Sequence, residues 1–283
     1  MQQNNIVDQL RRFYDTDSSR YRDAQWFSSN AAQTLYWATQ SLILKELQVN
    51  RQHRVLEIGC GPGTWTKILL SKEVEIEAVD LSPGMIQQAR EYVADQRIVF
   101  RQGDFLKLDF QVQGYDRILS VRVLEYFLDK KAVMEKCFQL LKPGGWMVFI
   151  TKSTSPIWKY RGLILNLLRK IGFWQAENFM NVPAEKGYDK LFWQDLISAK
   201  EAYYLVREIG FENCRVLPVL IRLPIVSLGL SEIPILRGKA ADRYLEFSRR
   251  LTDKINNNRR YQPSLSAIYF SESYAIIAQR PNI

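Results

Sequence analysis

The sequence predicts an α/β fold built on a doubly wound, mostly parallel sheet. Over residues 54–151, short runs of β-branched and apolar residues alternate with segments of helical periodicity. The connections between them are short, as is typical of βαβ units. The first apolar run ends in a glycine-rich segment, a sequence of strand, loop and helix that often opens a ligand-binding sheet. These three observations define the expected core.

Each element follows from its local pattern. Apolar runs predict strands at 54–59, 74–80, 97–101, 115–121 and 146–151. Helical spacing predicts helices at 64–72, 83–94 and 130–141, the last ending before the stop signal Lys142-Pro143-Gly144-Gly145. Farther along, the patterns predict a helix at 199–210, a strand at 213–221, a helix at 240–255 and a final strand at 269–279.

Length and composition narrow the class of protein. The chain has 283 residues and 33.2 kDa, which suits one elaborated domain. No uncharged apolar run approaches the roughly 18 residues of a membrane-spanning helix, and the first residues lack the apolar segment of a secretory signal. Three cysteines and one histidine argue against a zinc site or a disulfide framework. We therefore expect a cytoplasmic protein without a bound metal.

The net charge of +9 is unevenly distributed. Residues 152–283 hold 20 of the 39 basic side chains and 12 of the 30 acidic ones, so this half carries almost all of the excess. Such a half can face an anionic substrate, carrier, membrane or nucleic acid. A solvated basic face that serves solubility is at least as good an interpretation.

Three short motifs fall where a sheet of this kind binds its ligand, at the carboxyl ends of the strands. The first strand ends in Gly59-Cys60-Gly61-Pro62-Gly63, and Thr64 breaks the dinucleotide pattern, which needs glycine there. Asp80 closes the second strand, where a carboxylate can accept both ribose hydroxyls of a nucleoside. Gly103-Asp104-Phe105 follows the third strand, and it could take an adenine amino group and pack near the base. Together the three favour a nucleoside ligand.

Five segments, VLEIGCGPG, AVDLS, GDF, YDRILSVRVLEYF and LLKPGGWMVFI, resemble in this order the class I S-adenosylmethionine-dependent methyltransferases. The branch most similar acts on quinones, lipids and other small molecules. The resemblance covers about residues 50–152 and extends weakly to 200–280. It implies a Rossmann-like, seven-stranded methyltransferase sheet with helical cap insertions, and S-adenosyl-L-methionine as the cofactor.

The resemblance also implies roles for single residues. On the methionine side, the loop of Gly59, Cys60, Gly61 and Gly63 would pass under the methionine moiety, Glu57 would organise the polar end of the cofactor, and Ser120 and Val121 would line the pocket. On the nucleoside side, Asp80 would bind the ribose. Leu81 and Met85 would lie near the adenine, and Asp104 and Phe105 would flank it. Arg122 lines the mouth of the substrate pocket.

The catalytic side departs from the family. Many relatives carry histidine after the fourth strand, where this chain has Leu124-Glu125-Tyr126-Phe127. The single histidine, His53, precedes the first strand, which places it at the wrong end of the sheet. Tyr126 and Glu125 are the catalytic candidates. Proximity alone is an alternative, because alignment of two reactants can supply much of the rate.

Segments outside the core should select the acceptor. Residues 1–50 predict a helical lid, with a polar break from Asp15 to Asp23 and with Tyr14, Tyr21 and Trp26 as pocket walls. After the core at 51–152, we expect residues 153–198 to form a cap insertion that contains an apolar helix at 157–171. This helix has three interpretations: it covers a pocket, it lies on a membrane surface, or it only packs against the rest of the protein. Residues 199–283 complete the core and contain a second insertion at about 222–265.

The sequence thus predicts methyl transfer from S-adenosylmethionine to a small or medium, partly apolar acceptor of natural-product, lipid or quinone type, by in-line displacement. One alternative is an RNA, DNA or protein methyltransferase that uses the basic half, although Ser120-Val121-Arg122-Val123 stands where base-methylating members carry N/D-P-P-Y/F. Another is a non-catalytic, cofactor-binding partner protein. We expect a small-molecule acceptor, no nucleic acid and, as a second interpretation, peripheral membrane contact; the sequence does not define the oligomeric state.

Overall fold

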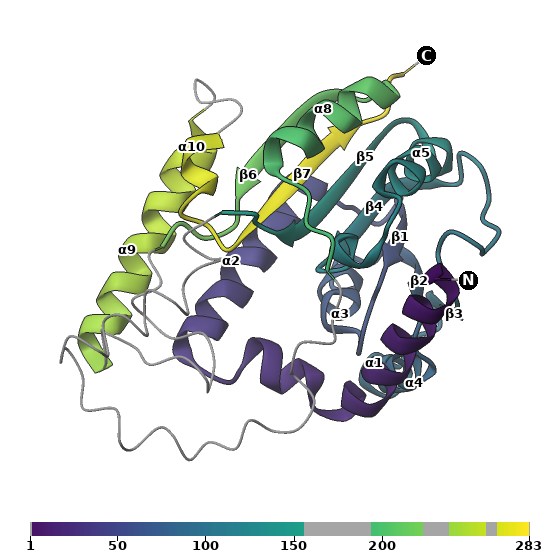
Figure 1. The fold of residues 1–283 in the computed structure, drawn as a ribbon, viewed down its shortest axis with the longest axis horizontal. Helices are drawn as coiled ribbons and strands as arrows, with labels where there is room; N and C mark the ends of the chain where they lie inside the picture. The colour runs from purple at the N-terminus through teal and green to yellow at the C-terminus, as the bar shows by residue number, and fades with distance from the viewer. Residues whose placement is uncertain (1, 156–193, 223–237, 259–264, 283) are drawn as a thin grey trace.

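The fold centres on a seven-stranded sheet with the strand order β3-β2-β1-β4-β5-β7-β6 (Figure 1). A computed structural model of the chain describes residues 2–155, 194–222, 238–258 and 265–282, and the structural statements below concern those residues. Strands β1 to β5 are parallel to one another, whereas β7 runs antiparallel between β5 and β6. The predicted α/β class and the Rossmann-like, seven-stranded sheet are confirmed.

The elements follow the predicted order. The strands are β1 (Arg54–Ile58), β2 (Glu75–Asp80), β3 (Ile98–Gln102), β4 (Tyr115–Val121), β5 (Leu141–Lys152), β6 (Glu212–Pro218) and β7 (Ser273–Gln279). The helices are α1 (Gln2–Trp26), α2 (Asn30–Leu47), α3 (Thr64–Leu70), α4 (Pro83–Tyr92), the 3₁₀ turn η1 (Leu124–Tyr126), α5 (Lys130–Leu140), α8 (Ala199–Ile209), α9 (Gly238–Asn257) and α10 (Leu265–Ile268).

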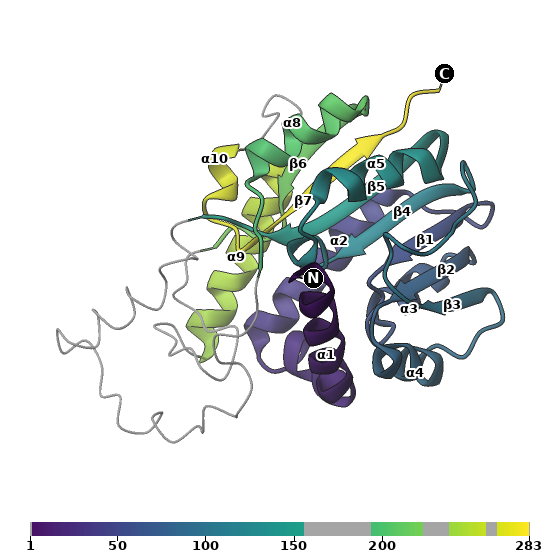
Figure 2. The same ribbon diagram turned by 45° about the vertical axis from the view of Figure 1, so that its right-hand side comes forward.

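Two helical layers cover the sheet (Figure 2). One apolar cluster joins side chains of α2, α3 and α4 to one face, including Ile43 and Leu69. The other joins α5 and α8 to the opposite face, including Met134 and Val206. Both faces are buried, so the central strands are apolar almost throughout, as parallel strands between two layers must be. The sheet is therefore a rigid platform for the loops at its strand ends.

The order of the strands determines where a ligand can bind. The chain leaves β1 on one side to build β2 and β3, then returns to place β4 on the other side of β1. The loops after β1 and β4 consequently diverge and leave a crevice at their carboxyl ends, which is the usual ligand site of such sheets.

Three predicted element boundaries are wrong. The polar stretch from Asp15 to Asp23 does not break the first helix, because α1 runs unbroken to Trp26 and the second helix begins only at Asn30. The Asp15 carboxylate accepts hydrogen bonds from the Ser82 hydroxyl and, at 3.0 Å, from the Gly84 N–H. Polar residues of this stretch thus face α4, which explains why they continue the helix.

The segment 142–145 is also not a turn before the fifth strand. Strand β5 begins at Leu141, which pairs with Tyr115, and the pairing then shifts to Trp146 with Arg117. The glycines lie in this irregularity, and Gly144 has the left-handed φ of 76°. A glycine at a β-bulge has the same sequence signature as a glycine in a turn. The last strand likewise begins at Ser273 rather than at 269, after the short helix α10.

The cap insertions are described only in part. The predicted helix at 157–171 lies outside the described residues, as does most of 153–198. Of the second insertion, α9 is described, and it packs Ala241 and Leu245 against Ala31 of α2. None of the helices in the described ranges combines the length and the apolar character needed to cross a membrane.

Candidate active site

A cavity opens at the carboxyl ends of β1, β2 and β4, beneath α1. Its wall is formed by most of the predicted site residues: Gly59, Cys60, Gly61, Asp80, Leu81, Met85, Asp104, Phe105, Val121, Arg122, Tyr126, Tyr14, Tyr21 and Trp26. Residues from β-strand ends far apart in the sequence and from the first helix therefore share one enclosed space.

The glycine loop has a backbone that larger residues would strain. Gly59, Gly61 and Gly63 have left-handed φ angles of 72°, 52° and 81°. A Cβ added at Gly59 would lie 2.1 Å from the Val123 side chain, whereas one at Gly61 would meet nothing within 4 Å. Glycine is thus needed at 59 for packing and at 61 for conformation, and it leaves open space beside the loop.

Asp80 is held in place by the backbone around it. Its two carboxylate oxygens accept hydrogen bonds from the Gly61 N–H at 2.8 Å and the Ser82 N–H at 3.0 Å. Burial raises the pKa of Asp80 to about 6, against the effect of these hydrogen bonds. The carboxylate is therefore oriented before any ligand arrives, and it is ionised at neutral pH.

Apolar side chains surround the space beyond Asp80. Leu81, Met85 and Phe105 lie in the wall there, together with the backbone of Gly103 and the side chain of Asp104. The Asp104 carboxylate also accepts the Leu106 N–H at 3.0 Å, so it both caps a turn and lines the cavity. Apolar side chains beside the carboxylates of Asp80 and Asp104 suit a nucleoside base attached to a ribose, so the residues present fit the cofactor that the sequence predicts.

Three predicted cofactor residues do not lie in the cavity wall. Glu57 is buried behind the loop, where one carboxylate oxygen accepts the Thr66 hydroxyl at 2.7 Å and the other has no partner within the described part of the chain. Burial raises the pKa of Glu57 to about 8. The Ser120 hydroxyl donates to the Ile58 carbonyl instead. Gly63 forms the N-cap of α3. All three shape the loop from behind.

The opposite end of the cavity is polar and rich in tyrosine. The Tyr14 hydroxyl donates to the Tyr126 hydroxyl at 2.7 Å, and the Gln194 amide donates to Tyr126 at 3.2 Å. The ring centroids of Tyr14 and Tyr21 are 5.8 Å apart. Tyr14 and Tyr21 line the cavity from α1 and Tyr126 lines it from η1, whereas Gln194, in the segment before α8, contacts Tyr126 without being part of the cavity wall.

The acid–base properties of this end argue against a tyrosinate base. Burial raises the pKa of Tyr14, Tyr21 and Tyr126, so all three phenols stay protonated at neutral pH. Glu125 does not reach the cavity wall, because its carboxylate accepts the Thr151 hydroxyl at 2.8 Å and lies 3.3 Å from Nε of Arg122. The cluster can donate hydrogen bonds and orient an acceptor, but it holds no side chain poised as a base.

Arg122 lies between Glu125 and Ser273, the first residue of β7. Its backbone has the left-handed φ of 64°, which is uncommon for a residue with a side chain. The guanidinium donates to the Ser273 hydroxyl at 2.8 Å and only a tenth of the side chain is exposed. Arg122 thus places a buried cation in the cavity wall, held by Glu125 and by the first residue of β7.

His53 lies where the sequence places it, directly before β1 and thus at the end of the sheet opposite the cavity. Its ring contacts Asn50, and burial lowers its pKa. Sequence reasoning assigned no site role to Gln194, because a glutamine far from the core motifs carries no pattern that marks it. It also assigned none to Asp15, although the hydrogen bonds that Asp15 accepts from Ser82 and Gly84 hold α1 in place above the cavity.

The sheet order, the oriented Asp80 and the apolar residues beside it define the class: this is a Rossmann-like sheet whose cavity fits a nucleoside. Residues 55–145 match the family model described as a methyltransferase domain. Residues 55–145 are therefore similar to a methyltransferase domain of the S-adenosylmethionine-dependent class I, and this similarity supports S-adenosylmethionine as the cofactor.

The relatives are similar over different parts of the chain. A malonyl-[acyl-carrier protein] O-methyltransferase of Priestia megaterium is 33% identical over 125 residues, which are 44% of this chain and 45% of that protein. A demethylmenaquinone methyltransferase of Staphylococcus aureus is 24% identical over 67% of this chain and 80% of that protein. The chain thus spans less than half of the first relative's length.

Among solved structures, a methyltransferase of Thermotoga maritima described as a possible histamine N-methyltransferase shares the fold with a TM-score of 0.56. It is 15% identical and covers 95% of this chain and 99% of its own. Likeness at this identity concerns the fold alone, so the acceptor must be argued from the site.

Proposed function

We propose that this protein transfers the methyl group of S-adenosylmethionine to a small or medium, partly apolar acceptor. One observation carries the proposal: a single cavity joins the oriented Asp80 carboxylate and the apolar side chains beside it to the tyrosine cluster of Tyr14, Tyr21 and Tyr126. A cofactor bound at the first end would present its reactive group toward the second. Enclosed, mainly apolar pockets with a few placed polar groups are typical of small-molecule sites.

Different residues of the cavity bind different parts of the cofactor. The Asp80 carboxylate accepts the ribose hydroxyls, and Leu81, Met85 and Phe105 enclose the base. The glycine backbone at 59–61 leaves room for the chain that leads to the sulfur. When bound, the cofactor supplies a methyl group on a sulfonium, so the new bond forms as the carbon–sulfur bond breaks and its electron pair stays on sulfur.

The tyrosine end then orients the acceptor. Protonated phenols donate hydrogen bonds to an oxygen or nitrogen of the acceptor and align its lone pair with the methyl carbon. Alignment at near-attack distance can supply a large part of the rate without a base. Helix α1 closes over the reactants and keeps water away. A proton released by the acceptor passes to water once the product leaves.

The acceptor class is tested by a turnover assay. The purified chain is incubated with S-adenosylmethionine and four acceptor groups: reduced quinones and other phenols, acyl thioesters with a free carboxylate, RNA, and bulk protein. Formation of S-adenosylhomocysteine together with a singly methylated small molecule supports the proposal. Methylated RNA or protein would replace it with the alternative that uses the basic half.

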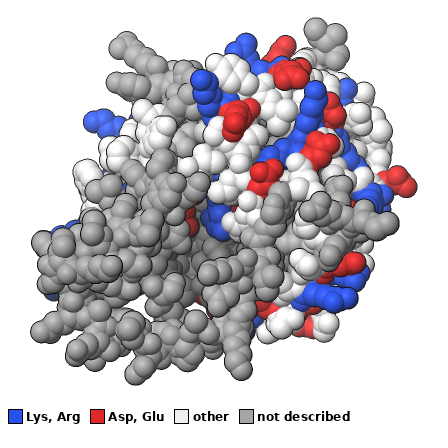
Figure 3. All heavy atoms as spheres, in the orientation of Figure 1, with Lys and Arg blue, Asp and Glu red and all other residues white. Residues whose placement is uncertain are grey.

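Two controls sharpen the assay. Calorimetry with S-adenosylhomocysteine shows whether the chain binds the cofactor; binding without turnover of any acceptor would favour the non-catalytic partner. Activity that needs anionic vesicles and falls steeply with salt would favour contact with a membrane surface, because screening weakens such contacts. On the face in Figure 3, the described Lys and Arg side chains are interspersed with Asp and Glu, which supports testing a small acceptor first.

A further inference from the structure

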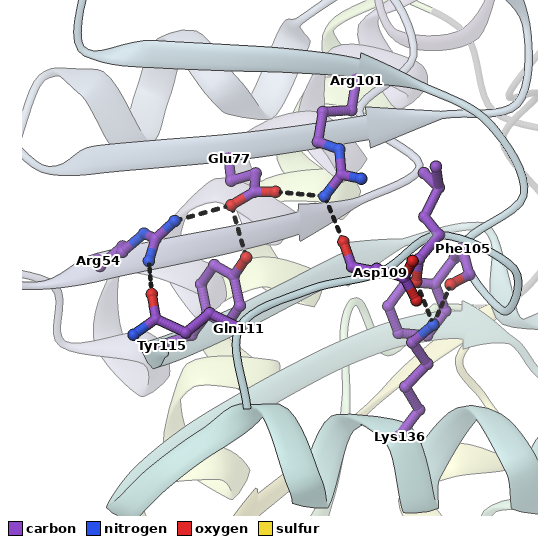
Figure 4. A network of polar contacts seen from close by, with 9 residues as sticks. Arg54, Glu77, Arg101, Phe105, Asp109, Gln111, Tyr115 and Lys136 are labelled. Atoms are coloured by element: carbon purple, nitrogen blue, oxygen red, sulfur yellow. Dashed lines mark hydrogen bonds and ion pairs between the residues drawn. The ribbon is translucent and has the colours of Figure 1, made fainter. Parts of the chain in front are cut away.

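One ammonium group outside the cavity holds the adenine end of the site. Lys136 lies on α5, and its Nζ donates to the Phe105 carbonyl oxygen at 2.8 Å (Figure 4). It also donates to two further carbonyl oxygens of the same loop, those of Leu106 at 3.2 Å and Leu108 at 2.6 Å. A lysine ammonium has three N–H donors. Each therefore has a backbone partner in the same loop.

That loop forms part of the cavity wall. Gly103, Asp104, Phe105 and Leu106 line the cavity, and the N–H groups of Lys107 and Leu108 fold back to the Asp104 carbonyl at 2.9 and 3.0 Å. The turn leaves the carbonyls of 105, 106 and 108 directed away from its own N–H groups. Without Lys136 these acceptors lose the donor toward which they converge.

The ammonium also contacts the aromatic side of the loop. Nζ lies 5.1 Å from the ring centroids of both Phe105 and Phe110, within the range of a cation–π attraction. The two rings are themselves 5.6 Å apart. Burial lowers the pKa of Lys136, and the carboxylates of Asp109 and Asp104 oppose that change. The cation thus holds the ring of Phe105 as well as its backbone.

A second anchor fixes the far end of the same loop. Arg101 on β3 donates to the Asp109 carbonyl at 2.6 Å and to the Glu77 carboxylate at 2.9 Å. Glu77, in turn, accepts from Arg54 at 3.0 Å and from the Tyr115 hydroxyl (Figure 4). The loop is therefore tied to β3 at one end, which leaves Lys136 as its tie to α5.

We propose that Lys136 is a positioning residue that sets the adenine selectivity of the cofactor site. It is not among the residues that line the cavity, and it acts through the backbone of Phe105 and the turn at Asp104. Once the loop is held, Phe105 lies at a fixed height beside the base and Asp104 is placed to accept the 6-amino group. This inference rests on the cofactor site and names a residue that no sequence motif marks.

The test compares Lys136→Met with Lys131→Met. Methionine keeps the stem of the side chain and removes the ammonium; Lys131 lies on the same helix, half its side chain is exposed, and it pairs only with Glu208 on the surface. Calorimetry is run with S-adenosylhomocysteine and with its inosine analogue, which lacks the 6-amino group. We expect Lys136→Met to lose about tenfold to a hundredfold in affinity for the adenine ligand.

The ratio of the two affinities separates positioning from general destabilisation. Lys136→Met should bring the adenine and inosine ligands close to equal affinity, and hydrogen exchange at the amides of 104–108 should speed up. Lys131→Met should match the wild type in both. An unchanged ratio in folded Lys136→Met would overturn the proposal.

A second variant of Lys136 and the wild-type control distinguish the possible outcomes. If Lys136→Met does not fold, Lys136→Gln, which retains N–H donors without the charge, is expected to show a smaller loss of the same selectivity, and an unchanged ratio there counts equally against the idea. Wild-type protein that binds no S-adenosylhomocysteine would contradict the cofactor site itself. Wild-type binding with normal selectivity in both variants would contradict only the role of Lys136.

Discussion

The Tyr14 hydroxyl donates a 2.7 Å hydrogen bond to the Tyr126 hydroxyl, which joins the first helix to the turn after β4 across 112 residues of sequence. The two rings meet edge to face with centroids 5.8 Å apart. Burial raises the pKa of both phenols, so the pair is a fixed set of protonated donors and not a base at neutral pH. The pair therefore ties α1 to η1 at the cavity wall.

The first prediction follows from that pair. Tyr14→Phe and Tyr126→Phe should each lower kcat about threefold to tenfold, since each removes one neutral hydrogen bond of about 1 kcal/mol. The double variant should lose less than the product of the two, because one interaction is removed twice. Steady-state kinetics of the four proteins with the acceptor from the assay above measures the coupling. Strictly multiplicative losses would show that the two hydroxyls act separately.

The second prediction concerns the ribose contact. Asp80→Ala should weaken binding of S-adenosylhomocysteine about tenfold to a hundredfold, because hydrogen bonds to a charged group contribute about 1.5–3 kcal/mol. Calorimetry on a variant whose circular dichroism matches the wild type provides the measurement. An unchanged affinity would mean that the ligand does not use this carboxylate.

Asp80 could be recognised from sequence for a physical reason. It ends an apolar run, parallel strands align their carboxyl ends at one edge, and the ligand crevice opens at that edge. The positions of Gly59, Gly61 and Asp104 follow by the same rule. The carboxyl ends of the parallel strands are thus the part of the site that local pattern determines.

The remainder of the site depends on contacts between distant segments. Nothing local to Tyr14 indicates Tyr126 as its partner, and Asp15 interrupts the apolar pattern of α1 because it faces Ser82 and Gly84. Lys136 is a lysine on an amphipathic helix until the fold brings three carbonyls to it. Such residues become functional only through tertiary packing, which periodicity does not encode.

The third prediction is a pH dependence of cofactor binding. Burial raises the pKa of Asp80 to about 6, so the carboxyl is protonated below that pH and loses its capacity to accept both ribose hydroxyls. Affinity for S-adenosylhomocysteine should therefore be constant above about pH 6 and fall by up to about tenfold per pH unit below it. Calorimetry from pH 5 to pH 7 tests this. Asp80→Asn should remove the step; a step that persists in that variant would belong to another group.

The fourth prediction concerns the single histidine. His53→Gln should leave kcat and KM for both substrates within about twofold, because His53 precedes β1 at the end of the sheet opposite the cavity. Its ring contacts only Asn50 among the hydrogen-bond partners that the structure gives, and glutamine can replace that contact. Kinetics beside a circular dichroism spectrum is the check. A large loss in a folded variant would show that the reaction occurs elsewhere.

The last prediction separates two roles of glycine in the loop after β1. Gly61→Ala should lower the free energy of unfolding of the ligand-free protein by about 1–2 kcal/mol, since its φ of 52° is left-handed but the added methyl meets nothing. Gly59→Ala should lower it by about 1–3 kcal/mol more, because its Cβ would lie 2.1 Å from the Val123 side chain.

Denaturant unfolding of the two variants measures the difference, and Val123→Ala provides the control. Combined with Gly59→Ala, it should recover part of the lost stability, because it removes the side-chain methyls that clash while the backbone strain remains. Combined with Gly61→Ala, Val123→Ala should only add the loss of stability that it causes alone. The order of the two variants should differ for cofactor binding. Gly61→Ala places its methyl in open space beside the cofactor loop, so its affinity for S-adenosylhomocysteine should fall, although it is more stable than Gly59→Ala. Equal unfolding free energies for the two glycine variants would contradict the close packing of the loop against Val123.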